Sequence, residues 1–140
     1  MYILITKRDK KMINHALNMA EMSNFPKYHI GCVVAQKGKV LNASFNSQKT
    51  HPVQKKYNKF RFEYDNTPHS VHAEIHALSQ ICNEDIDWKN VTVYIARKRK
   101  CDGEYGIAKP CSACMNMMKN LGIRNIVYTT DFGIACEEIL

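Results

Sequence analysis

Two short motifs in this 140-residue chain carry side chains suited to metal chemistry. The first, HAEIH, places a carboxylate at Glu74, two positions after His72. The second, PCSAC, places Cys111 and Cys114 three positions apart, behind a proline and at the expected start of a helix. Residues three apart lie on one side of a helix, so both thiols can contact the same metal ion. We interpret the two motifs as parts of one site.

These side chains favour zinc. Thiolate and imidazole groups suit Zn²⁺, and a catalytic zinc site keeps one position for water beside three protein ligands. Positions two apart on a regular helix diverge by about 200°, so His72 must precede the helix if it and Glu74 are to face one ion. We predict that His72, Cys111 and Cys114 bind zinc. Glu74 then takes a proton from the water and passes it to a leaving amine, which suits hydrolysis at an sp² carbon.

The elements that position these residues follow from the spacing of apolar side chains. Helices are expected from Thr6 to about Ser23, from His72 to about Asn83, and over 111–122 up to Gly122. Strands are expected as a hairpin over 30–45 and singly over 91–96 and 125–130. Strands separated by helices favour parallel pairing. We therefore expect one α/β domain, residues 1–140, whose first two strands are antiparallel.

H-A-E followed by P-C-x-x-C resembles the signature of the zinc-dependent cytidine and deoxycytidylate deaminase superfamily, which also includes tRNA adenosine deaminases. The resemblance extends from the first helix to the strand at 125–130. It implies a three-layer α-β-α sandwich with a mixed sheet, the first two strands antiparallel and the rest parallel. It also implies a Zn²⁺ cofactor held by His72, Cys111 and Cys114, with Glu74 as general acid and base.

The resemblance also implies a substrate and its contacts. Asn46 matches the position of a sugar-binding asparagine in relatives, and Ala73 and Pro110 are expected to contact the substrate as well. The first choice is cytosine in a mononucleotide, converting deoxycytidylate to deoxyuridylate, because H-A-E rather than C-A-E leads away from free-cytidine deaminases. The alternative is a deaminase of tRNA or single-stranded nucleic acid, acting on adenine or cytosine. Relatives further imply a homo-oligomer.

Two features depart from the family pattern. Relatives usually reach the cysteine helix through a short T-x-E-P-C segment, whereas ARKRKCDGEYGIAKPC intervenes here and Lys109 replaces the glutamate. The dipeptide Asp102-Gly103 is a strong turn signal, so 97–108 is predicted to be a hairpin excursion. Only a short tail is expected beyond residue 130, where many relatives have further elements.

The charge is uneven along the chain. Residues 1–60 hold eleven Lys and Arg against two acids, a net +9, whereas residues 61–140 hold nine against eleven, a net −2, giving +7 in all. The segment 49–64 interleaves cations with aromatic side chains, which suits either base stacking or, as we favour, an amphipathic lid helix. The RKRK run at 97–100 is interpreted as a solvated hairpin edge, with phosphate contact as the alternative.

Composition bounds the remaining choices. Only six residues precede the first charged residue, too few for the apolar part of a signal peptide, and no apolar run is long enough to span a membrane. We expect a soluble, cytoplasmic protein without disulfides. Two alternatives to a catalytic zinc site are considered. The C-x-x-C motif could be a redox pair, or the zinc could be structural, in a noncatalytic binding domain where Glu74 is dispensable. A structural zinc needs a fourth ligand, and the candidates are Cys82, Cys101, Cys136, His69 and His76.

Overall fold

The computed structural model describes residues 5–25, 28–48, 52–58, 71–99 and 101–139. The strands formed within these ranges are β1 (Ile30–Gln36), β2 (Lys39–Phe45), β3 (Val91–Lys98), β4 (Tyr105–Gly106), β5 (Asn125–Thr130) and β6 (Gly133–Glu138). The α-helices are α1 (Lys7–Ala20), α2 (Pro52–Tyr57), α3 (Ala73–Ser79) and α4 (Ser112–Leu121).

The strands form one mixed sheet in the order β2-β1-β3-β5-β6, with the short β4 paired to the end of β3. The β1–β2 hairpin is antiparallel and the β3–β5 pair, joined through α4, is parallel, as predicted. β1 also runs antiparallel to β3, so β2, β3 and β5 point in one direction.

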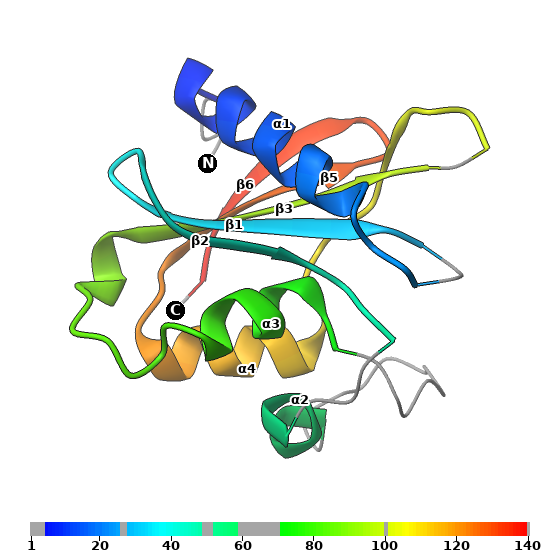
Figure 1. Cartoon of the computed structure of the whole chain (residues 1–140). Helices are drawn as coiled ribbons and strands as arrows, with labels where there is room; N and C mark the ends of the chain where they lie inside the picture. The colour runs from blue at the N-terminus through cyan, green and yellow to red at the C-terminus, as the bar shows by residue number, and fades with distance from the viewer. Residues whose placement is uncertain (1–4, 26–27, 49–51, 59–70, 100, 140) are drawn as a thin grey trace.

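The sheet is covered on both faces, which confirms the three-layer fold. α1 lies on one face, and α3 and α4 lie side by side on the other, with α2 outside them (Figure 1). α1 begins at a capping box: Asp9 N donates to Thr6 Oγ1, and Thr6 N donates to Asp9 Oδ2, both at 3.1 Å. It lies so close to β1 that a Cβ on Gly31 would be 1.8 Å from the carbonyl oxygen of Ala16, so glycine is required there.

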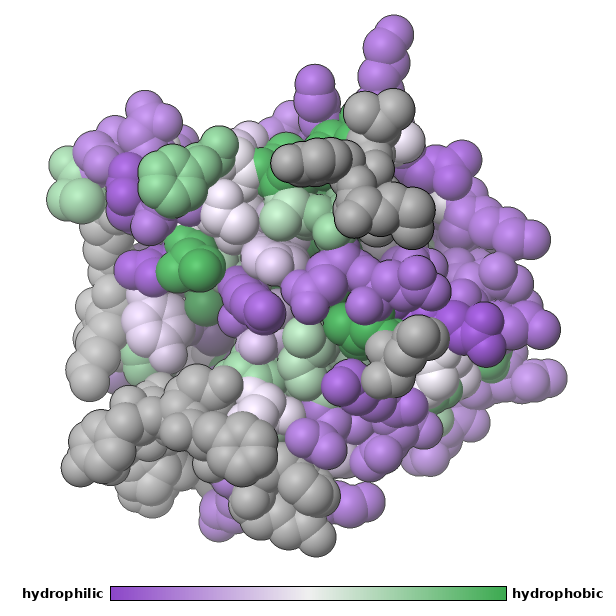
Figure 2. Space-filling model, turned by 180° about the vertical axis from the view of Figure 1, so that it is seen from behind, coloured by the Kyte–Doolittle hydropathy of each residue, from purple (hydrophilic) through white to green (hydrophobic). Residues whose placement is uncertain are grey.

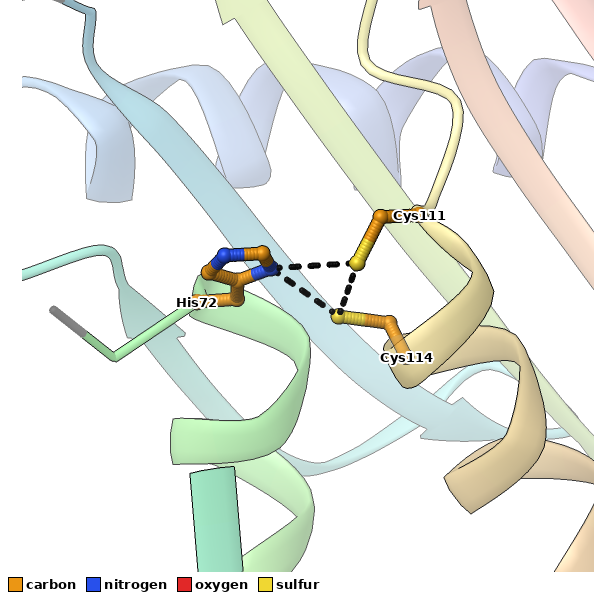
Figure 3. Close-up of side chains that lie close together, drawn as sticks. All are labelled: His72, Cys111 and Cys114. Atoms are coloured by element: carbon orange, nitrogen blue, oxygen red, sulfur yellow. Dashed lines mark hydrogen bonds between the residues drawn. The ribbon is translucent and has the colours of Figure 1, made fainter. Parts of the chain in front are cut away.

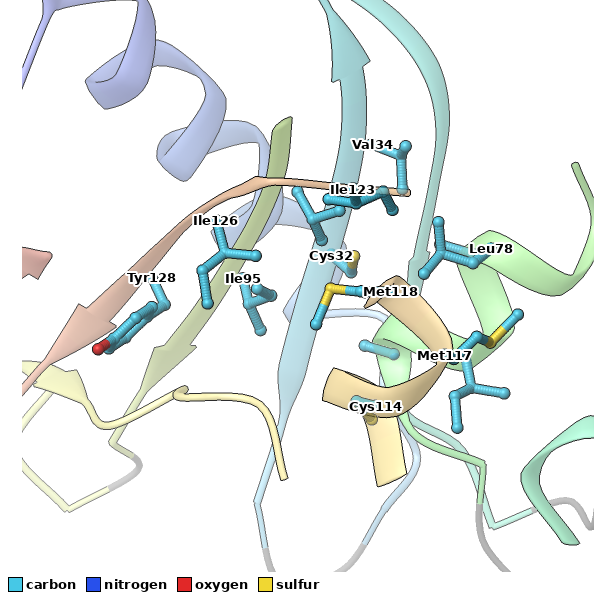
Figure 4. Close-up of a cluster of buried hydrophobic side chains, with 14 of the residues drawn as sticks. Cys32, Val34, Leu78, Ile95, Cys114, Met117, Met118, Ile123, Ile126 and Tyr128 are labelled. Carbon is cyan, nitrogen blue, oxygen red and sulfur yellow. The ribbon is translucent and has the colours of Figure 1, made fainter. Parts of the chain in front are cut away.

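The larger core fills the space between the sheet and the α3–α4 layer. Alternate residues of β1 and β3, such as Cys32 and Ile95, point into it and meet Met118 of α4 and Leu78 of α3 (Figure 4). Burying apolar side chains of this size stabilises the fold by about 1.5–3 kcal/mol each. This core fixes the position of both helices that carry the predicted metal ligands.

Two local features differ from the predictions, and one prediction is confirmed. α1 ends at Ala20 and α3 at Ser79, each a few residues earlier than expected, because turns follow both helices. The segment after residue 130, expected to be a short tail, is instead the strand β6, antiparallel to β5. The hairpin excursion is confirmed: β4 pairs antiparallel with the end of β3, and Gly103 takes a left-handed φ of 73° at the turn.

The surface seen from behind is mostly hydrophilic, with hydrophobic side chains in small separate patches (Figure 2). Among the described residues, no helix combines the length and the apolar character needed to cross a membrane. All six cysteines are free thiols. The described part of the lid segment predicted at 49–64 is α2, where Lys55 and Lys56 are exposed while Gln54 and Tyr57 are buried. Apart from Asn58, the rest of that segment lies outside the described residues.

Candidate metal centre

The two predicted ligand motifs lie at the starts of neighbouring helices. His72 is the N-cap of α3, with an extended backbone (φ −74°, ψ 150°), so it precedes the helix as its spacing from Glu74 required. Cys111 is likewise the N-cap of α4, again extended (φ −72°, ψ 170°), and Cys114 lies within the first turn. The side chains of His72, Cys111 and Cys114 point toward one another across the gap between the helices (Figure 3).

The spacing of the three donor atoms fits one zinc ion. His72 Nδ1 lies 3.3 Å from Cys114 Sγ and 3.4 Å from Cys111 Sγ, and the two sulfur atoms are 3.7 Å apart. Ligands at the usual tetrahedral Zn–N and Zn–S lengths are separated by about 3.5 Å (N to S) and about 3.8 Å (S to S). Donor types and distances therefore both suit Zn²⁺.

Within the described residues, the alternative fourth ligands do not join this cluster. Cys82, Cys101 and Cys136 lie elsewhere, and His69 is outside the described residues. His76, one turn after His72, faces β2, where its Nδ1 lies 2.6 Å from Ser44 Oγ and 3.2 Å from the carbonyl oxygen of Phe45. Three protein donors, with no fourth beside them in the described part of the chain, leave room for water at a metal, as catalysis requires.

The backbone at His72 is held by residues distant in sequence. Ser47 and Val71 form an isolated antiparallel bridge with two hydrogen bonds of 3.0 and 2.9 Å, which fixes the residue just before His72. His72 N then donates to Oε1 of Gln54 at 2.9 Å. Gln54 was not identified from the sequence, because one polar residue in a short helix carries no signal of its tertiary partner. The structure shows that it is a positioning residue for His72.

Glu74 lies in the first turn of α3 and is 4% exposed. Burial raises the pKa of its carboxyl group above the ordinary value, and the neighbouring His72 opposes that rise. Cys114 also contacts this side chain through a hydrogen bond. A carboxyl group with a raised pKa can both accept and return a proton near neutrality, which is the property required of a general acid and base.

The two thiols differ in their electrostatic surroundings. The hydrogen bond with Cys114 is the main cause that lowers the pKa of Cys111 to about 4, aided by His72 and opposed by burial. Burial raises the pKa of Cys114 well above its ordinary value. Of the two thiols, Cys111 therefore loses its proton more readily. This suits a metal ligand, because the deprotonated sulfur is the form that binds.

A cavity of about 240 Å³ opens onto this centre. We call floor the part formed by His72, Ala73, Glu74 and Cys111. We call rim the part formed by Tyr28, Arg97, Ile107 and Lys109. Ile30, Asn46 and Ala108 complete the lining. A cavity of this size, with apolar walls and a few polar groups, suits one small molecule.

The predicted substrate-binding residues have different positions. Ala73 and Asn46 line the cavity, whereas Pro110 is buried outside its lining. Asn46 is 4% exposed, and its Oδ1 accepts hydrogen bonds from Ser23 Oγ at 2.6 Å and from Ile30 N at 2.9 Å. Its Nδ2 donates to a backbone carbonyl at 3.0 Å. Asn46 therefore holds the cavity wall together, and its contact with a sugar stays a prediction, as does that of Pro110.

The rim contains two residues that the sequence analysis mentioned but did not assign to the site. Of the four residues predicted to form a solvated edge, Lys98 is exposed, Arg97 and Arg99 are half-buried, and Lys100 lies outside the described residues. The prediction is wrong for Arg97, which lines the cavity. Lys109, noted only as a departure from the family pattern, also lines it. Its ammonium group lies 3.8 Å from a carboxylate oxygen of Glu137 on β6.

Comparison with known proteins agrees with this geometry. The family model for the cytidine and deoxycytidylate deaminase zinc-binding region matches residues 6–130. No curated protein matches the chain significantly by sequence.

Among solved structures, the chain is similar to the apo dCMP deaminase of the cyanophage S-TIM5, with a TM-score of 0.64 at 17% identity, over 91% of this chain and 86% of that chain. The same cyanophage enzyme in complex with dCMP and dUMP gives a TM-score of 0.63 at 17% identity, over 91% and 85%. The chain is also similar to a cytidine deaminase from Burkholderia pseudomallei, with a TM-score of 0.64 at 18% identity, over 93% and 91%. At such identities the similarity establishes the fold.

Proposed function

The chain belongs to the cytidine and deoxycytidylate deaminase family and is a zinc-dependent deaminase of pyrimidine nucleotides or nucleosides, and from this premise we propose that its substrate is cytosine in a mononucleotide. Deoxycytidylate is the first choice, with deoxyuridylate and ammonia as products. The observation that supports the chemistry is the buried Glu74 beside the His72–Cys111–Cys114 cluster, in the floor of one small cavity.

The proposed reaction replaces the exocyclic amine at C4 of the ring by oxygen. A bound Zn²⁺ supplies Lewis-acid activation of the attacking water. Glu74 accepts a proton from that water as the C–O bond forms, and returns it as the C–N bond breaks and ammonia leaves. The two protons of the water finish on ring N3 and on ammonia, so atoms and charges balance.

The residues of this chain proposed to hold the metal are His72, Cys111 and Cys114. The burial of Glu74 matters for both halves of the proton transfer, because it raises the pKa of the carboxyl group and so stabilises the protonated form relative to an exposed glutamate. The apolar wall around it excludes bulk water, which strengthens electrostatic interactions inside the cavity.

One of the similar structures supports the choice of nucleotide, since the cyanophage S-TIM5 enzyme was solved in complex with dCMP and dUMP. We test it by measuring ammonia release from deoxycytidine, its mono- and triphosphates, adenosine compounds and short single strands. We expect deoxycytidylate to give the highest kcat/KM. Greater activity on adenosine compounds or on single strands would replace this proposal by the alternative of a nucleic-acid or adenine deaminase.

Assembly and location are part of the same proposal. The family resemblance supports a homo-oligomer, and the free state of all six cysteines supports a reducing compartment such as the cytoplasm. Light scattering coupled to size-exclusion chromatography tests the first, and a monomer at micromolar concentration would contradict it.

A further inference from the structure

The side chain of Arg97 is held on two sides at the rim of the cavity. Its guanidinium carbon lies 5.5 Å from the ring centroid of Tyr28, within the range of a cation–π contact. On another side lies Gly106: a Cβ built on this residue would be 2.9, 3.0 and 3.1 Å from Cδ, Nε and Cγ of Arg97. Glycine therefore leaves the space that the arginine side chain occupies.

The backbone around Arg97 is anchored as well. Arg97 N donates to Thr129 Oγ1 at 3.0 Å, and the same hydroxyl donates to the carbonyl oxygen of Gly106 at 2.7 Å. Thr129 is fully buried on β5, and Arg97 pairs with Gly106 across the β3–β4 ladder. The hairpin excursion that departs from the family pattern thus fixes an arginine at the cavity.

The charge of Arg97 is not neutralised by another described residue. In the described ranges, no carboxylate lies within ion-pair distance of its guanidinium group, whereas Arg99 pairs with Asp102 at 2.9 Å and Asp131 at 3.5 Å. Lys109, also in the rim, is paired with Glu137 at 3.8 Å. The carboxylate of the cavity, Glu74, belongs to the floor. The rim therefore presents positive charge to any molecule that enters.

We propose that Arg97 reads the terminal phosphate of the nucleotide and sets the preference of this enzyme for nucleotides over nucleosides. The proposal rests on the proposed function. A guanidinium group forms two parallel hydrogen bonds to a phosphate, and an arginine already held in place loses less conformational entropy on binding. A phosphomonoester carries about one more negative charge than an internal diester, so a guanidinium group with no carboxylate beside it among the described residues favours the monoester.

The test compares ligands that differ only in the phosphate. We expect Arg97→Ala to lower kcat/KM on deoxycytidylate by about 10- to 100-fold, mainly through KM, and to leave deoxycytidine within about twofold. Arg97→Lys keeps the charge without the paired hydrogen bonds, so its loss should be intermediate. Gly106→Ala should displace the arginine and reproduce part of the loss. The matched control is Lys98→Ala, at an exposed neighbour outside the cavity lining. This change should not alter the ratio of kcat/KM on deoxycytidylate to kcat/KM on deoxycytidine.

A second measurement does not depend on turnover. Titration calorimetry with the products should show that Arg97→Ala weakens dUMP binding and leaves deoxyuridine binding unchanged. Equal losses on phosphorylated and unphosphorylated ligands, or unchanged dUMP binding, would overturn the role of Arg97. An equal loss on an oligonucleotide that lacks a terminal phosphate would overturn its assignment to the monoester.

The two proposals fail in different ways. If zinc-loaded wild-type protein deaminates no cytosine compound, the proposed function is wrong, and the ratio of dUMP to deoxyuridine affinities still decides whether Arg97 reads phosphate. If the wild type is active on deoxycytidylate and Arg97→Ala keeps the same preference, the function stands and this inference is wrong.

Discussion

The floor and the rim of the cavity are built from different kinds of structure. The floor comes from the first residues of two helices, α3 and α4, each held by the larger core. The rim comes from the end of β3, the excursion that follows it, and Tyr28 just before β1. The floor is largely buried, while Ile107 of the rim is 53% exposed. The residues proposed to carry out the chemistry lie in the floor, and the residues proposed to select the substrate lie in the rim.

The sharpest way to break this division is to change the floor without disturbing the fold. Glu74→Gln keeps the size and burial of the side chain and removes its proton transfer, so kcat should fall by about 10³- to 10⁴-fold while zinc content stays the same. Steady-state kinetics and metal analysis measure both. Glu84→Gln, on an exposed residue, is the control. Near-native turnover would exclude Glu74 from catalysis and favour a noncatalytic zinc-stabilised domain.

Loss of a ligand should affect metal and stability together. Purified wild-type protein should contain about one zinc per chain, and Cys111→Ala should weaken zinc binding by more than about 100-fold and lower Tm, since binding is coupled to folding. Metal analysis after dialysis and a thermal melt test this. The matched control is Cys101→Ala, at an exposed cysteine outside the metal centre. This variant should keep the zinc content of the wild-type protein. Full occupancy in Cys111→Ala would remove that residue from the metal centre.

Asn46 tests whether the wall between floor and rim is structural. Asn46→Ala leaves the backbone amide of Ile30 without its acceptor, and a buried group of this kind costs about 1–3 kcal/mol. The hydroxyl of Ser23 loses the side-chain oxygen but keeps the backbone carbonyl of residue 46 as an acceptor at 2.8 Å. We therefore expect a decrease of about 2 kcal/mol in the free energy of unfolding, measured in urea. The exposed Asn83 offers the control Asn83→Ala. Native stability combined with a raised KM would instead identify Asn46 as a sugar contact alone.

The smallest effect concerns salt. A mononucleotide releases few counterions on binding, so kcat/KM on deoxycytidylate should fall only modestly between low and moderate salt, and a short single strand should be a poor substrate. Charge reversal of the exposed Lys55 and Lys56 on α2 should leave deoxycytidylate turnover nearly unchanged. If single strands surpass deoxycytidylate and this double change abolishes that activity, the nucleic-acid alternative replaces our first choice.

The same division explains how much the sequence could reveal. The floor was predictable because its residues fall in two short motifs with informative spacing: the two-residue spacing of His72 and Glu74 required a nonhelical backbone at His72, and the structure has it. The position of Arg97 at the cavity could not be predicted. The four cations of residues 97–100 look alike in the sequence, and only strand pairing places Gly106 beside one of them. Gln54 depends on a tertiary hydrogen bond that no local pattern encodes.

The failure to predict the strand β6 has a simpler cause. β6 follows a turn at Asp131, and its residues from Gly133 to Glu137 are all half-buried, so it lacks the alternation that identifies most strands. It lies at the edge of the sheet, where pairing with β5 determines its conformation more than its own residues do. Its contribution to the cavity is Glu137, which supports Lys109 of the rim.

The hydrogen bond from His72 N to Gln54 has a consequence for motion. α2 contacts both ligand-bearing helices, because Tyr57 accepts a hydrogen bond from Asn120 of α4 at 3.3 Å while Gln54 holds the start of α3. Detachment of α2 would expose the His72 amide to solvent exchange. Because linkage is reciprocal, an ion that orders His72 must also favour the state in which α2 is attached to α3. Zinc should therefore slow amide hydrogen exchange across 53–57, although none of the three proposed ligands lies in that helix.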